Sequence, residues 1–210
     1  MKQFQNAIIA VVALVAFIVG MAFYNAKTEK HYSQQTYVYQ PARPLPEFSL
    51  INQVGEEFDH EDLKGKWSFV FLGYLSCPDI CPMTMAKFSR LIPELNKIPD
   101  VQSQVLFVSV DPKRDNQQKI KQYVEYFHKD VIGLRAEHKD LFPFVRNLGL
   151  MYSVPGKDEV DGYFVDHSAS VILTNPEGQI AAIFKPEIKL NQVPTVDTSL
   201  VLQDFITLVE

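Results

Sequence analysis

The spacing of apolar and polar positions along the chain predicts strands and helices that alternate. Two continuous apolar runs, residues 67–74 and 105–110, are typical of strands that are buried on both faces. Each run is followed by apolar residues at helical spacing, which predicts a helix after each strand. These helical positions are Met85, Phe88, Ile92 and Leu95 after the first run, and Ile120, Tyr123, Val124 and Phe127 after the second.

The rest of the pattern completes an α/β order. Phe48, Leu50 and Phe58 indicate a small hairpin that turns at Gly55, ahead of the first long apolar run. Strand, helix, strand, helix, strand and then a hairpin and a final helix predict a thioredoxin-like fold with a mixed central sheet flanked by helices. The later elements are expected as a strand at 131–134, a helix at 139–148, hairpin strands at 169–174 and 179–184, and a helix at 195–209.

The amino-terminal pattern is different, because residues 7–23 contain no charged side chain. As a helix this run would be about 26 Å long, just enough to cross a hydrocarbon core of about 30 Å. It is also longer than the apolar part of a typical signal peptide, about 7–15 residues. We therefore expect a single transmembrane anchor at residues 7–24, after a cytoplasmic stub at residues 1–6. The alternative is a signal peptide cut near Met21–Ala22 or Ala26.

Residues 25–45 are expected to form a flexible tether between this anchor and a domain at residues 46–210. The segment from Tyr32 onward is polar and rich in Gln, and it contains Pro41 and Pro44, so it cannot bury enough apolar surface to fold alone. The net charge is −5, and no long run of Lys and Arg is present. Nothing in this charge pattern favours a nucleic-acid partner.

The chain contains two cysteines, Cys77 and Cys81, and both lie where the first buried strand is followed by a helix. In open α/β sheets this is where ligands bind, and N–H groups at a helix amino terminus favour a thiolate over a thiol. A disulfide that closes so short a loop would stabilise the fold by only roughly 2 kcal/mol. A metal-binding or redox role is therefore favoured over a structural staple.

His167 is the histidine that the fold would bring to these thiols. In a thioredoxin-like arrangement the loop before the hairpin's first strand lies beside the thiol loop. Two thiolates and one neutral imidazole form a soft set of three ligands that suits copper(I), whereas structural zinc normally requires four protein ligands. Asp166 is a candidate to orient the imidazole through its second nitrogen. The other histidines, His31, His60, His128 and His138, are interpreted as surface or hydrogen-bonded residues.

Other candidate residues have structural explanations. Met83 and Met85 could offer thioether ligands, but two positions apart on a helix they point in different directions, so Met85 is expected in the core. Asp115 with Gln118 resembles a capping box, and helix capping is enough to explain Asp115. Asp111 is expected at the same end of the sheet as the thiols, where it either supports the site or forms a turn.

Three motifs resemble those of a known family. They are Gly-Tyr-x-x-Cys-Pro-Asp-Ile-Cys-Pro over residues 73–82, Val-Ser-Val-Asp-Pro over 108–112 with Arg114-Asp115, and Val-Asp-His-Ser-Ala-Ser over 165–170. On these motifs the chain is similar to the Sco/SenC copper-binding proteins over most of residues 45–210. One departure is Leu-Ser at positions 75–76, where relatives often carry Thr-Phe.

This resemblance implies a metallochaperone that serves assembly of the binuclear copper centre of cytochrome c oxidase. It implies copper ligands at Cys77, Cys81 and His167, with subunit II of the oxidase as the protein that accepts copper. It also implies a membrane-anchored domain that faces the periplasm or the mitochondrial intermembrane space. Whether Cys77 and Cys81 rest as two thiols or as a disulfide is left open.

A thioredoxin-like thiol-disulfide reductase is the alternative function, and a peroxiredoxin-like peroxidase is a more distant one. Reductases of this type usually have two residues between their cysteines and a cis-proline just before the hairpin strand. Here three residues separate Cys77 from Cys81, and His167-Ser168 stands where that proline is expected. These differences favour metal binding, although a redox role at the cysteines of a copper protein stays open.

Overall fold

The computed structural model describes residues 2–28, 30–153 and 163–210, and it divides into two compact units, residues 1–31 and 32–210. Residues 153–162 are polar, which predicts a loop, but residues 154–162 lie outside the described part of the chain. The first unit is one helix, α1 (Lys2–Thr28). Its segment Gln3–Met21 contains 19 residues and has a mean hydropathy of 2.3, so it is long and apolar enough to cross a membrane.

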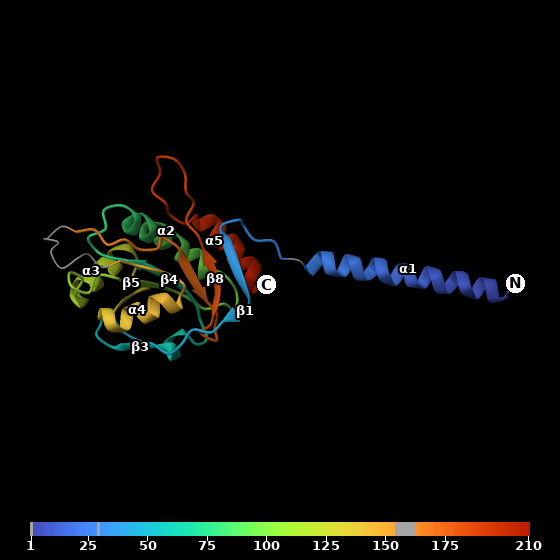
Figure 1. Ribbon diagram of the computed structural model, residues 1–210, viewed down its shortest axis with the longest axis horizontal. Helices are drawn as coiled ribbons and strands as arrows, with labels where there is room; N and C mark the ends of the chain where they lie inside the picture. Colours follow the sequence, from blue (N-terminus) through green and yellow to red (C-terminus); the bar gives the residue numbers. More distant parts are fainter. Residues whose placement is uncertain (1, 29, 154–162) are drawn as a thin grey trace. The chain divides into compact units, whose positions relative to one another are not determined.

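The second unit is built on one mixed sheet, as the sequence predicts (Figure 1). In the described residues the strand order is β1-β8-β7-β4-β5-β6-β2-β3. Strands β4, β5 and β6 run parallel, and every other neighbouring pair is antiparallel. The strands are β1 (Thr36–Arg43), β2 (Ser49–Asn52), β3 (Glu57–Asp59), β4 (Trp67–Gly73), β5 (Ser103–Ser109), β6 (Val131–Arg135), β7 (Val171–Thr174) and β8 (Ile180–Phe184).

Helices cover both faces of this sheet. A 3-10 helix, η1 (His60–Leu63), precedes β4, and α2 (Ile80–Leu95) follows it. Then come α3 (Gln117–Phe127), α4 (His138–Asn147) and α5 (Thr198–Val209). The sequence predicts a helix that begins at Pro82, which suits the first helical position. In the structure α2 begins two residues earlier, at Ile80, so Cys81 lies in its first turn. Pro82 is tolerated there because the first N–H groups of a helix have no partner within the helix.

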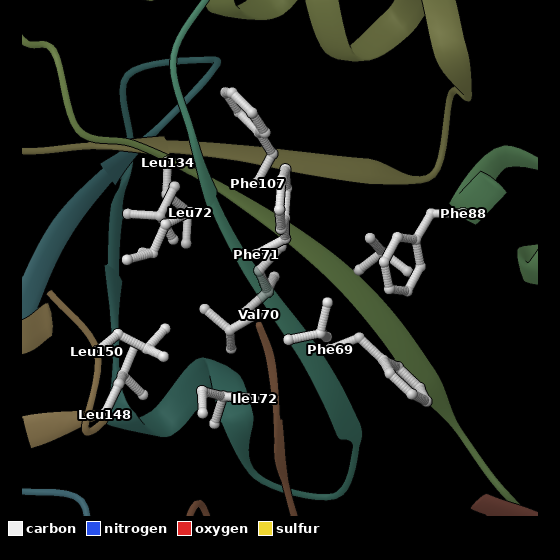
Figure 2. Close-up of a cluster of buried hydrophobic side chains, with 14 of the residues drawn as sticks. Phe69, Val70, Phe71, Leu72, Phe88, Phe107, Leu134, Leu148, Leu150 and Ile172 are labelled. Atoms are coloured by element: carbon white, nitrogen blue, oxygen red, sulfur yellow. The ribbon is translucent and has the colours of Figure 1, made fainter. Parts of the chain in front are cut away.

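The core lies on both sides of β4, which confirms that this strand is buried on both faces. Figure 2 shows Phe69 and Phe71 on one side of the strand and Val70 and Leu72 on the other. Phe69 packs against Phe88 of α2 and Phe205 of α5, with ring centroids 6.1 and 5.1 Å away. Because alternate side chains of a strand point to opposite faces, β4 anchors helices on both sides of the sheet.

The prediction of a flexible tether at residues 25–45 is wrong for residues 36–43, because these residues form strand β1. This strand pairs antiparallel with β8, with Thr36 opposite Phe184 and Val38 opposite Ala182. The polar composition of residues 36–43 does not indicate a strand. An edge strand such as β1 gains much of its stability from backbone hydrogen bonds to its neighbour, here β8, and these do not depend on apolar side chains. Val38 and Tyr39 also pack against the core.

Asp204 of α5 fastens the start of this unit. The carboxylate is buried and accepts hydrogen bonds from the Ser33 amide at 3.1 Å, from the Ser33 hydroxyl at 2.6 Å and from the Thr36 hydroxyl at 2.6 Å. Hydrogen bonds to a charged acceptor are stronger than neutral ones. The domain therefore begins at about Tyr32 rather than at residue 46.

We expect Asp204→Ala to lower the free energy of unfolding of residues 32–210 by about 2–3 kcal/mol, because it leaves several partly buried donors without this charged acceptor. Urea denaturation measures this change. The matched control is Gln203→Ala, an exposed neighbour on the same helix, which should change the stability by less than about 0.5 kcal/mol. Equal unfolding free energies for the two variants would contradict the role of Asp204.

Candidate metal centre

The two cysteines are presented by the turn that joins β4 to α2. Cys77 is half-buried in the loop, and Cys81 is fully buried in the first helical turn. The backbone N–H of Cys81 donates to the Cys77 sulfur at 3.4 Å, so a helix amino-terminal N–H does face the first thiol as predicted. Both residues are free thiols, and their disulfide stays a prediction.

His167 reaches the cysteines from the segment that precedes β7. Its Nε2 lies 3.4 Å from the Cys81 sulfur. Its Nδ1 lies 3.1 Å from the Ser168 carbonyl oxygen, which can only accept, so Nδ1 carries the proton and donates it there. This hydrogen bond leaves the Nε2 lone pair directed at the sulfurs, which is the state that a metal ligand requires.

The expected orienting role of Asp166 is not what the structure shows. Asp166 is exposed, and its backbone carbonyl accepts from the Ser153 amide at 2.8 Å. Among the described residues, His167 Nδ1 forms its hydrogen bond with the Ser168 carbonyl instead. Adjacent side chains diverge on an extended segment, which is why the neighbouring carboxylate does not reach the ring.

The two sulfurs and the imidazole nitrogen lie within 4.8 Å of one another. Ligand bonds of about 2.0–2.3 Å in a trigonal arrangement would place such atoms about 3.5–4 Å apart. The site therefore needs only a small contraction to enclose one ion. The structure thus brings together the three residues that the sequence predicts as neighbours.

The two thiols differ in acidity. The pKa of Cys77 falls to about 4, mainly because the Cys81 thiol donates to its sulfur, and the backbone N–H groups of Cys81 and Asp79 add to this effect against partial burial. The pKa of Cys81 is raised, first because its thiol donates to Cys77 and then by burial. The pair therefore holds one accessible thiolate and one buried thiol.

Aromatic rings hold the imidazole in place. The ring of Phe71 lies 6.2 Å from that of His167 and the ring of Tyr74 lies 5.8 Å away, both in edge-on geometry. A cavity of about 250 Å³ opens beside Cys77 and His167 and is also lined by Phe164. A small ligand or the side chain of a partner could therefore reach the accessible sulfur.

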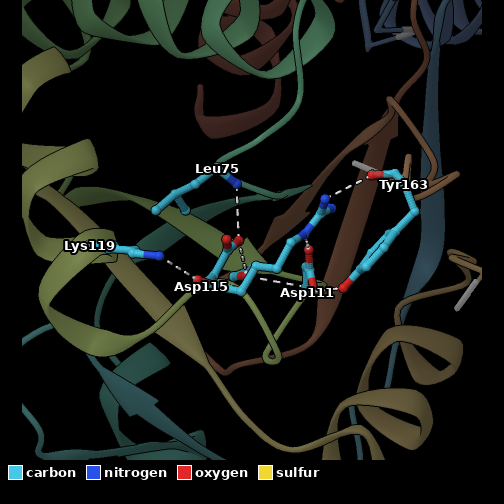
Figure 3. A network of polar contacts seen from close by, with 7 residues as sticks. Leu75, Asp111, Asp115, Lys119 and Tyr163 are labelled. Carbon is cyan, nitrogen blue, oxygen red and sulfur yellow. Dashed lines mark hydrogen bonds and ion pairs between the residues drawn. The ribbon is translucent and has the colours of Figure 1, made fainter. Parts of the chain in front are cut away.

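Asp115 supports the cysteine loop rather than capping a helix, so the capping interpretation is wrong. Its carboxylate accepts from the Leu75 amide at 3.0 Å and from the Ser109 hydroxyl at 2.7 Å (Figure 3). The cap of α3 is Asn116, whose side chain accepts from the Lys119 amide at 2.9 Å. Burial raises the pKa of Asp115, and the two donors oppose this shift.

Arg114 links the two segments that carry the ligands. It pairs with the buried Asp111 carboxylate and donates to the Tyr163 carbonyl at 2.8 Å, while the Tyr163 hydroxyl donates to Asp111 at 2.8 Å (Figure 3). Its guanidinium lies 3.7 Å from the centre of the Tyr163 ring and 5.6 Å from that of Tyr74. Asp111 therefore supports the site. Tyr163 was missed in the sequence, where only the motif residue Arg114 pointed to this network.

The remaining candidates agree with their structural interpretation except His60, whose Nδ1 is buried without a hydrogen-bond partner in the described part of the chain. Met85 is fully buried in the core, whereas Met83 is exposed. His138 is hydrogen-bonded to the Tyr152 hydroxyl at 2.9 Å, and His128 accepts from the Asp130 amide at 3.2 Å. None of these side chains belongs to the Cys77–Cys81–His167 group.

Comparison with known proteins places this site in a family context. The SCO1/SenC family model matches residues 38–200. A putative copper-binding protein of Stutzerimonas stutzeri is 33% identical over 154 residues, which cover 73% of this chain and 75% of that protein. The mitochondrial SCO2 homolog of Mus musculus is 33% identical over 173 residues, which cover 80% of this chain and 68% of that protein.

Solved structures agree with the sequence relatives. The crystal structure of yeast Sco1 with copper bound superposes with a TM-score of 0.69 at 27% identity, and the match covers 80% of this chain and 88% of that one. The family match includes β1 through the start of α5, and therefore the whole of the candidate metal centre. The chain belongs to the SCO1/SenC family.

Proposed function

We propose that this protein is a copper chaperone that binds one copper(I) ion through Cys77, Cys81 and His167. The observation that carries the proposal is the convergence of two sulfurs and a correctly oriented imidazole nitrogen within 4.8 Å, beside a cavity at the carboxyl end of β4. Soft sulfur ligands with one imidazole select copper(I) over harder ions. The names of the relatives support the same cargo.

The two thiols would take different parts in metal binding. Cys77 supplies an accessible thiolate that can make the first bond without losing a proton. Cys81 must release its proton as the ion binds, because the thiolate is the ligand. His167 completes the set through Nε2, with Nδ1 held by the Ser168 carbonyl. An exposed first ligand and a buried second one favour transfer of the ion through Cys77.

We further propose that the copper is delivered to subunit II of cytochrome c oxidase, at its binuclear copper centre. The support is family membership together with the SCO2 homolog of mitochondria, the organelle that contains such an oxidase. Helix α1 would hold the domain at the membrane, facing the periplasm or the equivalent mitochondrial space. Its apolar segment is what supports this location.

Thiol-disulfide exchange with the cysteines of a copper protein is the second candidate function. One observation favours it: a partly exposed thiolate at Cys77 stands next to a buried thiol at Cys81. An attacking thiolate with a resolving thiol beside it is the arrangement that exchange requires. The two functions use the same sulfurs and differ in whether His167 is needed.

We expect Cys77→Ser, Cys81→Ser and His167→Ala each to weaken copper(I) binding by more than about 100-fold. Removal of a residue that only hydrogen-bonds to a metal ligand lowers metal affinity by about 10–100-fold. Each of these variants removes a ligand itself, so its affinity should fall further. Competition with a chromogenic copper(I) chelator, with the thiols reduced, measures the affinity. His128→Ala, which removes a histidine at the end of α3, is the matched control and should bind copper normally.

The His167→Ala variant also separates the two functions in cells. It should still form and exchange the Cys77–Cys81 disulfide, because both sulfurs remain, while oxidase assembly fails. Normal assembly of the oxidase in cells whose only copy carries His167→Ala would instead make thiol exchange the working chemistry.

We expect the alkylation of Cys77 by iodoacetamide to be almost independent of pH between about pH 6 and 8. A pKa of about 4 leaves this sulfur fully deprotonated throughout that range, and the rate falls only as the pH approaches 4. An ordinary thiol with a pKa of about 8.5 would react about ten times faster for each unit of rising pH. Mass spectrometry after timed quenching gives the rates.

The control for this measurement is Cys77→Ser, which keeps only the buried Cys81. It should react slowly until denaturant is added. A rate for Cys77 that climbs steadily up to pH 8 would show that its thiolate is not stabilised by the neighbouring donors.

We expect protease added to intact spheroplasts to cleave the protein beyond α1 and to release its soluble domain. An apolar helix that spans the bilayer and a domain on the outer side together require this result. Immunoblotting of the membrane and soluble fractions detects the product. Protection of the domain would reverse the proposed orientation, and a soluble domain before protease treatment would indicate a cleaved signal peptide.

A further inference from the structure

The loop between β8 and α5 exposes two large aliphatic side chains. Ile188 is 87% exposed and Leu190 is 92% exposed, the highest values among the large apolar residues described outside α1. They flank Lys189, whose ammonium pairs with the Glu187 carboxylate at 2.8 Å, and Lys185 is exposed at the start of the loop. Figure 1 shows this orange-red loop, residues 185–197, projecting beyond the sheet and its helices. Exposed apolar residues that project together indicate a contact surface.

The base of this loop is fixed, so its tip is held outward. Glu187 and Thr195 form a short antiparallel bridge, with the Glu187 amide donating to the Thr195 carbonyl at 3.1 Å. Lys87 of α2 donates to the Thr195 hydroxyl at 2.6 Å and to the Val196 carbonyl at 3.0 Å. At the tip, the Gln192 amide donates to the Lys189 carbonyl at 3.2 Å. Leu190 therefore stands in a tight turn, and no side chain of the described residues covers it.

The loop leaves the sheet beside the point where the amino-terminal segment enters the domain. The Lys185 amide donates to the Gln35 carbonyl at 2.9 Å, and Thr36 pairs with Phe184. Only seven positions separate Gln35 from Thr28, the last residue of α1. An extended chain of that length spans at most about 25 Å. A membrane that holds α1 is thus within reach of the base of the loop.

The same end of the sheet carries the candidate metal centre. One row of paired residues crosses four strands: Thr36 with Phe184, Phe184 with Val171, and Val171 with Phe71. Phe71 lies two residues before Gly73, where β4 ends and the cysteine loop begins. The base of the loop, the chain's entry point and the cysteine loop therefore lie at one end of the sheet.

We infer that the loop at residues 185–197 is a second membrane contact, which inserts Ile188 and Leu190 shallowly into a bilayer that contains anionic lipid. Exposed apolar side chains beside a lysine suit the interface, where the aliphatic groups enter the acyl boundary and the Lys185 ammonium meets lipid phosphates, while Lys189 is shared with Glu187. This inference rests on one part of the proposed function, namely that α1 anchors the chain in a membrane. It would hold the metal centre toward the membrane, where a membrane-embedded oxidase lies.

Tryptophan placed at the loop tip tests this contact in the full-length protein. Leu190→Trp and Ile188→Trp would each be reconstituted into vesicles of phosphatidylcholine and phosphatidylglycerol in equal parts, with or without bromine on the acyl chains. Val54→Trp is the matched control, since Val54 is exposed on the β2–β3 turn near the opposite edge of the sheet. Phe17→Trp in α1 reports the anchor itself. The emission of the unsubstituted protein, with its single Trp67, is subtracted.

We expect the loop variants to show blue-shifted emission and quenching by brominated lipid, and Val54→Trp to show neither. Quenching at Phe17 without quenching at either loop position would overturn the membrane contact and leave the anchor intact, and the loop would then be a surface for a protein partner. Quenching at the loop but not at Phe17 would contradict the anchor on which this contact rests and would overturn the inference as well. Equal quenching at Val54 and Leu190 would indicate adsorption without orientation and would also overturn the contact.

Discussion

Burial of β4 on both faces is the constraint on which the site depends. Its alternating side chains pack Phe69 and Phe71 against one layer and Val70 and Leu72 against the other. The strand is therefore fixed between β5, which runs parallel to it, and β7, which runs antiparallel. Because β4 ends where β7 begins, the loop after the first and the segment before the second meet. The cysteines and His167 become neighbours through this pairing.

The arrangement of the two thiols suits both metal binding and thiol-disulfide exchange. A hydrogen bond from the Cys81 thiol stabilises the Cys77 thiolate, which lowers the pKa of one sulfur and raises that of the other. In the proposed copper site a soft cation would replace the shared proton and engage both sulfurs, whereas an oxidant or a partner disulfide would engage Cys77 first. The imidazole of His167 would add a third ligand. Thiol exchange calls only for the two sulfurs, so the fixed tautomer of the imidazole favours metal binding.

The turn after β5 contributes structure to both halves of the site. Asp115 fastens the cysteine loop at the Leu75 amide, and Arg114 with Asp111 fastens the segment that leads to His167 through Tyr163. These groups are buried or partly buried, and they form hydrogen bonds with one another or with the backbone. Removing one of them therefore leaves its partner without a hydrogen bond. The distance between the sulfurs and the imidazole thus depends on residues that do not bind the ion.

The sequence by itself determined the elements whose signal is local: the apolar runs of β4 and β5, the helices that follow them, and the cysteine pair between strand and helix. The predicted order of strands and helices placed His167 beside that pair, and the motif resemblance implied the same three residues. The tertiary structure alone decided that residues 36–43 form a strand on β8, that Asp115 binds Leu75 rather than capping α3, and that Ser168 rather than Asp166 orients the imidazole. Periodicity reports which face of a segment is buried, but a hydrogen bond between distant segments depends on where the fold places the partner, which no local pattern records.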